Sequence, residues 1–229
     1  MGYDLHSLPI DFLTLRDLGF DLCFLVSNPR PVVIDVGANT GQTIDLLRST
    51  LDKPRIFSFE PNPALAASLR QKYADCGVVV EPMAVGSSEG TSAFNVLENH
   101  ELSSILELRR HDKNPFSDTA ILQTIRVPVT TVDCYAAKHD LTHIDLLKID
   151  TQGFDLEVLR GAAEMLRRCA VGTLLIEVNF ISLYEDQASF GDIERFLAEK
   201  GYGLLTLYEV NRPNSCLRWA TACFRRIVQ

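Results

Sequence analysis

Four acidic residues stand at or near the ends of apolar stretches that have the length of buried strands. Asp35 lies near the end of 32–36, Glu60 follows 55–59, Asp150 ends 144–150, and Glu177 lies near the end of 173–178. Because the carboxyl ends of parallel strands meet at one edge of an α/β sheet, we expect the four carboxylates to share a crevice. A single acid in such a place often only caps the next helix. Four together suit a cationic ligand or a metal.

The loop after the first of these stretches reads Gly37-Ala38-Asn39-Thr40-Gly41 and precedes a helical pattern. Strand, tight loop and helix form the first unit of a doubly wound sheet, and an acid after the second strand can hold both hydroxyls of a ribose. A dinucleotide site requires a second glycine where Asn39 stands, and no P-loop motif occurs. S-adenosylmethionine carries no phosphate. We therefore expect Asp35 to face its ammonium or sulfonium side, Gly37 and Gly41 to allow close approach, and Glu60 to hold its ribose.

Composition indicates one α/β domain with short additions. The chain has 229 residues, 46% hydrophobic and 23% charged, with a net charge of −8. This charge disfavours nucleic acid as the main partner. No apolar run approaches the length of a membrane span, and no basic segment followed by an apolar run marks a signal peptide. We therefore expect a cytoplasmic protein without a membrane span. The six cysteines form no C-x-x-C pair and fit no zinc spacing, and nothing in the sequence indicates an oligomeric state.

Hydrophobic periodicity divides the chain into a helical preface, 1–31, and a domain, 32–229. The helical pattern of the preface covers 7–27, before Asn28-Pro29-Arg30-Pro31. Within the domain we expect helices over 63–74, 154–168 and 189–200, a third strand over 78–81, extended segments over 91–97 and 123–131, and final strands over 203–208 and 216–224. The polar segment 98–122 is long for a connection and is interpreted as a substrate lid or loop.

Several motifs in order carry a resemblance to a known family. They are Asp35-Val-Gly-Ala-Asn-Thr-Gly41, Phe59-Glu60-Pro61-Asn62-Pro63, Met83-Ala84-Val85-Gly86, Val129-Thr130-Thr131-Val132-Asp133, and the run from Leu147-Lys148-Ile149-Asp150 to Arg160-Gly161-Ala162. This series resembles the FkbM family of methyltransferases over residues 32–205. One departure is Gln152, where the family often has Glu, which removes a charge and puts any role of that position as base or metal ligand in doubt.

The resemblance implies a mostly parallel, seven-stranded, Rossmann-like methyltransferase sheet with helices on both faces and an antiparallel last strand. It also implies S-adenosylmethionine as the methyl donor and O-methylation of a hydroxyl on a sugar or natural-product metabolite. The acceptor would be a small molecule or glycan. The implied cofactor-binding residues are Asp35, Gly37, Ala38, Asn39, Gly41, Glu60, Pro61, Asn62, Met83 and Ala84. Ser103 and Ser104 match a serine-containing family segment, and with Gln152 they are candidates for substrate contact.

Methyl transfer to a hydroxyl requires alignment of the acceptor and benefits from removal of its proton. Asp150, at the end of a central strand, is the first candidate for a base, and Glu177 is the second. Together they could instead hold Mg²⁺, which prefers oxygen ligands, but two acids give little support for a metal site. Lys148, inside the same apolar strand, either extends to the crevice or pairs with a neighbouring acid. His100 and His111, in 98–122, could serve as bases or simply be solvated.

Two alternative hypotheses of function stand beside that of an O-methyltransferase. One is an NAD-binding oxidoreductase on a similar sheet, which the missing second glycine disfavours. The other is a binding module that has kept the fold and lost the chemistry, for which Gln152 is the only hint. The last segment carries Arg212, Arg218, Arg225 and Arg226, and we interpret it as an edge strand protected by charge.

Overall fold

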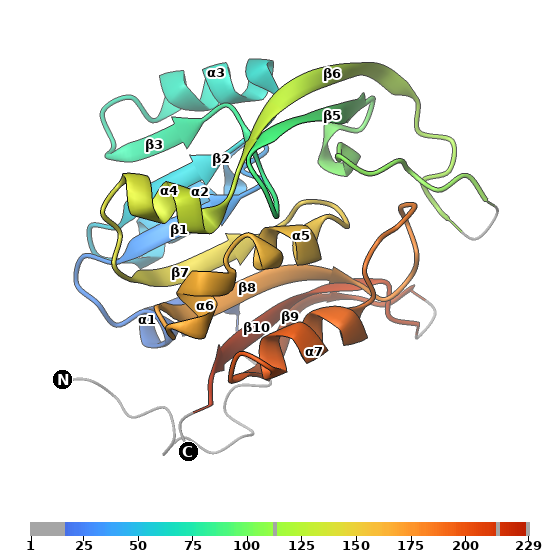
Figure 1. Ribbon diagram of the computed structural model, residues 1–229. Helices are drawn as coiled ribbons and strands as arrows, with labels where there is room; N and C mark the ends of the chain where they lie inside the picture. Colours follow the sequence, from blue (N-terminus) through green and yellow to red (C-terminus); the bar gives the residue numbers. More distant parts are fainter. Residues whose placement is uncertain (1–16, 112–113, 214–215, 228–229) are drawn as a thin grey trace.

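The computed structural model describes residues 17–111, 114–213 and 216–227. Seven strands form a main sheet in the order β3-β2-β1-β7-β8-β10-β9, and three form a smaller sheet in the order β4-β6-β5 (Figure 1). The main sheet comprises β1 (Val32–Val36), β2 (Arg55–Phe59), β3 (Val78–Glu81), β7 (Ile144–Ile149), β8 (Val171–Asn179), β9 (Tyr202–Asn211) and β10 (Trp219–Arg226). The smaller sheet comprises β4 (Ala84–Val85), β5 (Gly90–Leu97) and β6 (Ile121–Thr130).

The predicted sheet is confirmed, including its antiparallel last strand. The neighbouring pairs β1–β2, β2–β3, β1–β7 and β7–β8 are parallel, whereas β10 is antiparallel to both β8 and β9. All four strand-end acids therefore lie toward the same edge of the sheet. The smaller sheet was expected only as two extended segments, and its short strand β4 had not been predicted.

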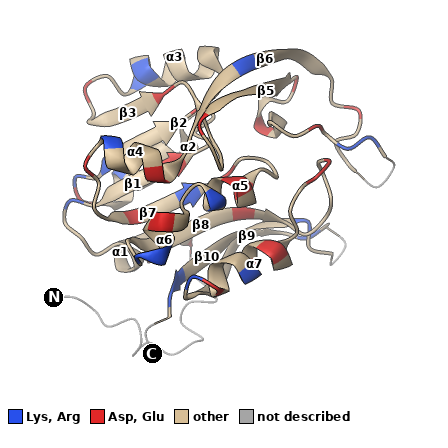
Figure 2. Ribbon diagram, in the orientation of Figure 1, with Lys and Arg blue, Asp and Glu red and all other residues tan. Residues whose placement is uncertain are grey.

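Helices cover both faces of the main sheet because successive residues of a strand point to opposite sides. Val33 packs in the core with residues of α1 (Leu18–Leu25), α2 (Gln42–Thr50) and α3 (Pro63–Lys72). Ile34 packs in the core with residues of α4 (Val132–Lys138), α5 (Asp155–Arg160), α6 (Ala163–Arg167) and α7 (Phe190–Ala198). Basic and acidic residues are interspersed over the helices and outer loops (Figure 2). None of the helices that the structure describes has both the length and the apolar character needed to cross a membrane.

Two predicted helices differ from the observed ones. The preface helix, expected over 7–27, begins at Leu18 behind an Asp17 cap, and residues 7–16 lie outside those described. The helix expected over 154–168 is divided into α5 and α6 at Gly161. The Asp133 carboxylate accepts hydrogen bonds from the amides of Glu164 and Met165 at 2.9 and 3.0 Å, so it caps a new helix start. Helix α4, which carries Asp133, had not been predicted.

The interpretation of the last strand as an edge strand was wrong. Strand β10 inserts between β8 and β9, and β9 forms the edge of the sheet. Residues 220–224 of β10 are all buried, which is the pattern of a strand covered on both faces. The arginines at 225 and 226 follow this buried stretch and had suggested an exposed strand.

The segment 98–122 packs as an ordered wall over the carboxyl edge of the main sheet. It contains a short 3-10 helix, η3 (His100–Leu102), and it pairs through two isolated β-bridges, Asn95 with Ser104 and Leu108 with Tyr184. Leu97, Leu102 and Leu108 form a separate small core with Leu183 and Tyr184. Residues 112–113 lie outside the described part of the chain.

Gly161 allows the smaller sheet to pack closely on the helix layer. A Cβ atom at position 161 would lie 2.0 Å from the Gly86 carbonyl oxygen, next to β4. Because its φ of −72° suits any residue, Gly161→Ala isolates this contact. We expect it to lower the free energy of unfolding by about 1–3 kcal/mol in urea denaturation.

Gly191→Ala is the matched control, because its Cβ would meet no atom closer than the Ser189 hydroxyl at 3.8 Å. That substitution lies in α7, where alanine should stabilise the helix by about 0.5–1 kcal/mol. Equal stability of the two variants would contradict the assigned packing role of Gly161.

Candidate active site

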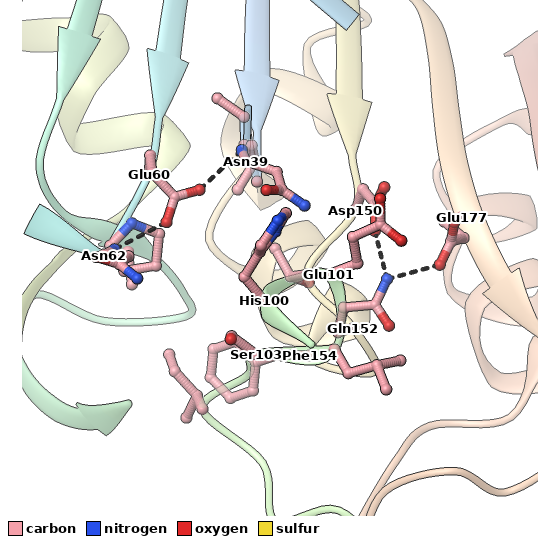
Figure 3. Close-up of a pocket in the computed structure, with 18 of the residues that line it drawn as sticks. Asn39, Glu60, Asn62, His100, Glu101, Ser103, Asp150, Gln152, Phe154 and Glu177 are labelled. Atoms are coloured by element: carbon pink, nitrogen blue, oxygen red, sulfur yellow. Dashed lines mark hydrogen bonds between the residues drawn. The ribbon is translucent and has the colours of Figure 1, made fainter. Parts of the chain in front are cut away.

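A pocket with a volume of about 350 Å³ opens at the carboxyl edge of the parallel strands. Its lining comes from the ends of β1, β2, β7 and β8, from the start of β10, and from the 98–122 segment. In Figure 3, Glu60 and Asn62 lie on one side, and Asp150, Gln152 and Glu177 lie on the other, with Asn39 and His100 between them. A pocket of this size at this edge is the usual place for a ligand in an open α/β sheet.

The backbone amides of the loop after β1 donate hydrogen bonds to other groups of the protein. The amides of Gly37 and Ala38 both donate to the Phe59 carbonyl at 3.0 Å, and that of Gly41 donates to the Ala38 carbonyl at 2.8 Å. The amide of Asn39 donates to Glu60 Oε2 at 2.8 Å. A pyrophosphate is held by free amides at such a loop, so this arrangement opposes a dinucleotide. Asn39 takes the left-handed conformation, with φ of 48°.

The two glycines of this loop are required by the protein's own packing. Gly37 has φ of 88°, and a Cβ there would lie 1.9 Å from the Asp150 carbonyl oxygen. Gly41 has φ of 91°, and its Cβ would lie 2.5 Å from the Tyr73 hydroxyl. Gly37 also lines the pocket, whereas Gly41 lies outside the lining. At Gly41 the structure shows a close approach of Leu69 and Tyr73, at the end of α3, and the predicted approach of a ligand there stays a prediction.

Glu60 is held in place by two backbone amides and faces the pocket. It accepts from Asn39 through Oε2 and from Asn62 through Oε1, both at 2.8 Å. Burial raises the pKa of Glu60 to about 7, and the two amide hydrogen bonds oppose the shift. Pro61, Asn62, Met83 and Ala84 line the pocket beside it, as does Ala38. Each carboxylate oxygen keeps a free lone pair for a ligand hydroxyl.

Asp35 lies beneath the pocket rather than in its lining. It is completely buried, and Ser58 donates its hydroxyl to Oδ2 at 3.0 Å. Burial raises the pKa of Asp35 to about 6 against the opposing charge of Lys148. Asp35 lies beside its register partners Ser58 of β2 and Lys148 of β7, whereas the following residues Val36 and Gly37 line the pocket. The structure thus places Asp35 outside the pocket lining, and its contact with a ligand stays a prediction.

Gln152 joins the two candidate catalytic acids. Its Nε2 donates to Asp150 Oδ1 at 2.9 Å and to Glu177 Oε1 at 2.8 Å, and its Oε1 lies 3.0 Å from the Tyr184 hydroxyl. Figure 3 shows the amide between the two carboxyl groups. Burial raises the pKa of Glu177 to about 8, and the charge of Asp150 adds to this shift. At neutral pH, therefore, Glu177 retains a proton.

Lys148 pairs with a neighbouring acid, which was one of the two alternatives that the sequence analysis left open. Its Nζ lies 3.4 Å from Asp150 Oδ2, and the residue is only 6% exposed. Burial alone would lower the pKa of this lysine, but the charges of Asp150, Glu177 and Asp35 raise it above its ordinary value. Lys148 is therefore a cation that faces three carboxyl groups from below the pocket.

The structure separates the two serines. Ser103 lines the pocket, whereas Ser104 lies outside the lining and donates its hydroxyl to the backbone carbonyls of Thr151 and Gln152, at 3.2 and 2.9 Å. Ser104 thus ties the 98–122 segment to the loop that carries Gln152. The lining also contains His100 and residues that sequence reasoning missed, among them Phe116, Asn179 and Trp219. Only the single occurrence of tryptophan in the chain could have drawn attention to one of them.

Comparison with solved structures places this sheet among methyltransferases. An rRNA methylase from Streptococcus thermophilus is similar in fold with a TM-score of 0.51 and 13% identity, covering 93% of this chain and 98% of that one. Magnesium protoporphyrin IX methyltransferase (ChlM) from Synechocystis PCC 6803, solved with bound S-adenosylmethionine, has a TM-score of 0.50 and 11% identity, covering 90% and 76%. At these identities the likeness concerns the fold alone.

The sequence comparison is more specific. The model of the methyltransferase FkbM domain matches residues 35–204, and this chain belongs to that family of S-adenosylmethionine-dependent methyltransferases. The chain is similar to the 2-O-methyltransferase NoeI of Sinorhizobium fredii, with 25% identity over 71% of this chain and 69% of that protein. It is also similar to methyltransferase sdnD of Sordaria araneosa, with 24% identity over 88% and 85%.

The raised pKa of Glu177 predicts how stability depends on pH. The unfolded chain loses this proton near the ordinary value of 4.5, whereas the folded chain loses it near 8. Glu177 therefore lowers the free energy of unfolding progressively as pH rises from about 4.5 to about 8. We expect Glu177→Gln to make this decline shallower, measured by urea denaturation at a series of pH values.

Glu89→Gln is the control, because Glu89 lies exposed in a turn. An equal change of slope in both variants, or no change for Glu177→Gln, would contradict the assigned burial of a protonated carboxyl group.

Proposed function

We propose that this methyltransferase acts on a hydroxyl group of a sugar or natural-product metabolite. The observation that carries the proposal is the pair Asp150 and Glu177, bridged by Gln152 at the wall of the pocket opposite Glu60. A carboxylate at this place can accept the proton of a hydroxyl group during methyl transfer. The name of NoeI, a 2-O-methyltransferase, supports the same chemistry.

The residues present fit S-adenosylmethionine better than a dinucleotide. The backbone amides of residues 37–39 already donate hydrogen bonds within the protein, so they are not available to bind a pyrophosphate. Glu60 presents a carboxylate to the pocket for two ribose hydroxyls. Asn39 Oδ1 is buried without a hydrogen-bond partner among the described residues, and it lies where the ammonium group of an amino acid could donate to it. Gly37, Ala38, Pro61, Asn62, Met83 and Ala84 would complete this half of the site.

When bound, the cofactor supplies a methyl group on a sulfonium, and the chain's own residues act on the acceptor. The proton of the acceptor hydroxyl passes to Asp150, whose Oδ2 faces Lys148 at 3.4 Å. Glu177, which keeps its proton at neutral pH, can donate a hydrogen bond that orients the acceptor. The site does not favour Mg²⁺ between Asp150 and Glu177, because the Gln152 amide nitrogen occupies that position and donates to both carboxyl groups.

The choice of cofactor is tested by thermal unfolding with S-adenosylhomocysteine and with NAD. At about 100 times its Kd, a ligand adds roughly 2.7 kcal/mol to the free energy of unfolding. We expect the midpoint to rise with S-adenosylhomocysteine and to stay unchanged with NAD. Glu60→Gln should weaken the S-adenosylhomocysteine shift, because the amide donates where a carboxylate accepts. A shift with NAD alone would overturn the proposal.

Asp150→Asn tests the base. We expect it to lower kcat by about 10²–10⁴-fold with an accepted hydroxylated compound, measured by transfer of a radioactive methyl group. Binding of S-adenosylhomocysteine, measured by calorimetry, serves as the control and should be retained. Unchanged turnover in this variant would remove Asp150 from the reaction, and turnover in the native protein would exclude a binding module without chemistry.

A further inference from the structure

Beyond the two carboxyl groups, the pocket continues into a region that we name the aromatic subsite, lined by Phe116, Asn179, Leu183 and Trp219. Asn179 ends β8, and Trp219 begins β10 as its register partner. Phe116 comes from the 98–122 segment, and its ring centroid lies 6.1 Å from that of Trp219. Both rings are only partly buried. Three separate parts of the fold thus bring aromatic, apolar and amide groups to one end of the pocket.

Acidic side chains dominate the ionisable groups of the pocket lining, although Glu177 among them keeps its proton at neutral pH. The acidic lining residues are Glu60, Glu101, Asp150 and Glu177, and among the described residues that line the pocket there is neither a lysine nor an arginine. Lys148 lies below Asp150 and pairs with it. An anionic group on the acceptor would therefore meet carboxylates without a facing cation, which disfavours binding through like-charge repulsion.

We propose that the aromatic subsite binds the methyl acceptor as an uncharged or cationic hydroxylated ring, and that the acidic lining excludes anionic acceptors. This inference rests on the proposed function and assigns its substrate class. The rings of Phe116 and Trp219 pack on the apolar C–H face of such a compound, because partly buried aromatic groups supply a large contact area. The Asn179 amide supplies a donor and an acceptor for ring hydroxyls. Trp219 and Phe116 are thus specificity-determining residues.

The single tryptophan makes this inference testable without turnover. Trp219 is the only tryptophan of the chain, so tryptophan fluorescence, excited selectively over that of the six tyrosines, reports on the aromatic subsite. The probes are phenyl glucoside, phenyl glucosaminide and phenyl glucuronide, which share one ring and differ in charge. Each is titrated into protein saturated with S-adenosylhomocysteine. We expect the first two to change the fluorescence, and the glucuronide to bind at least about tenfold more weakly.

Variants distinguish the contribution of the aromatic rings to binding from that of the acidic lining. Measured by calorimetry, Trp219→Ala should lose at least about tenfold in affinity for phenyl glucoside, whereas Trp219→Phe should largely retain it. Glu101→Gln, which removes a charge from an exposed acid of the same lining, should narrow the difference in affinity between glucoside and glucuronide. Leu122→Ala is the control, because Leu122 is 66% exposed on β6 and lies outside the lining. It should leave all three affinities unchanged.

Two results would overturn the inference while leaving the proposed function intact. One is glucuronide binding as tight as that of the glucoside, and the other is no response to any probe in protein that S-adenosylhomocysteine stabilises. Failure of S-adenosylhomocysteine itself to stabilise the protein would instead remove the proposed function.

Discussion

Carboxyl groups held close together away from bulk water are the constraint on which the rest of this site depends. Like charges in a poorly polarisable surrounding repel strongly, so such a cluster persists only if protons, cations or donors compensate it. Here Lys148 faces three of the acids from below, and the Gln152 amide donates to two of them from the side. Glu177 keeps a proton at neutral pH. Each compensating group therefore also determines which carboxyl group can act as a base.

In the cofactor half of the pocket, the backbone amides of the loop after β1 form hydrogen bonds within the protein. The amides at 37–39 are bonded to Phe59 and Glu60, and Gly37 makes room for the Asp150 carbonyl. The same contacts that pack β1 between β2 and β7 thus fix the Glu60 carboxylate. A rigid, internally satisfied loop of this kind reduces the ordering needed when a ligand binds.

Sequence reasoning reached the sheet, the order of its strands along the chain and the strand-end acids, because all three depend on local patterns of apolar and acidic residues. It missed what depends on contacts between distant segments. Asp35 was expected to face the cofactor, but it is buried beside Ser58 and Lys148 and lies outside the pocket lining. The break at Gly161 arises from the Gly86 backbone, and the position of Trp219 arises from the insertion of β10 between two other strands. None of these contacts leaves a periodic signal in the sequence.

The insertion of β10 also bears on how the chain reaches its native state. Strand β9 precedes β10 in sequence, but among the described strands it pairs only with β10. During synthesis, β9 therefore cannot join the sheet until residues 219–226 have emerged. Such late, non-local pairing is slow compared with helix formation and leaves strand edges exposed in the interval. The pairing of β10 with β8 that places Trp219 in the pocket wall is therefore also the pairing that connects β9 to the rest of the sheet.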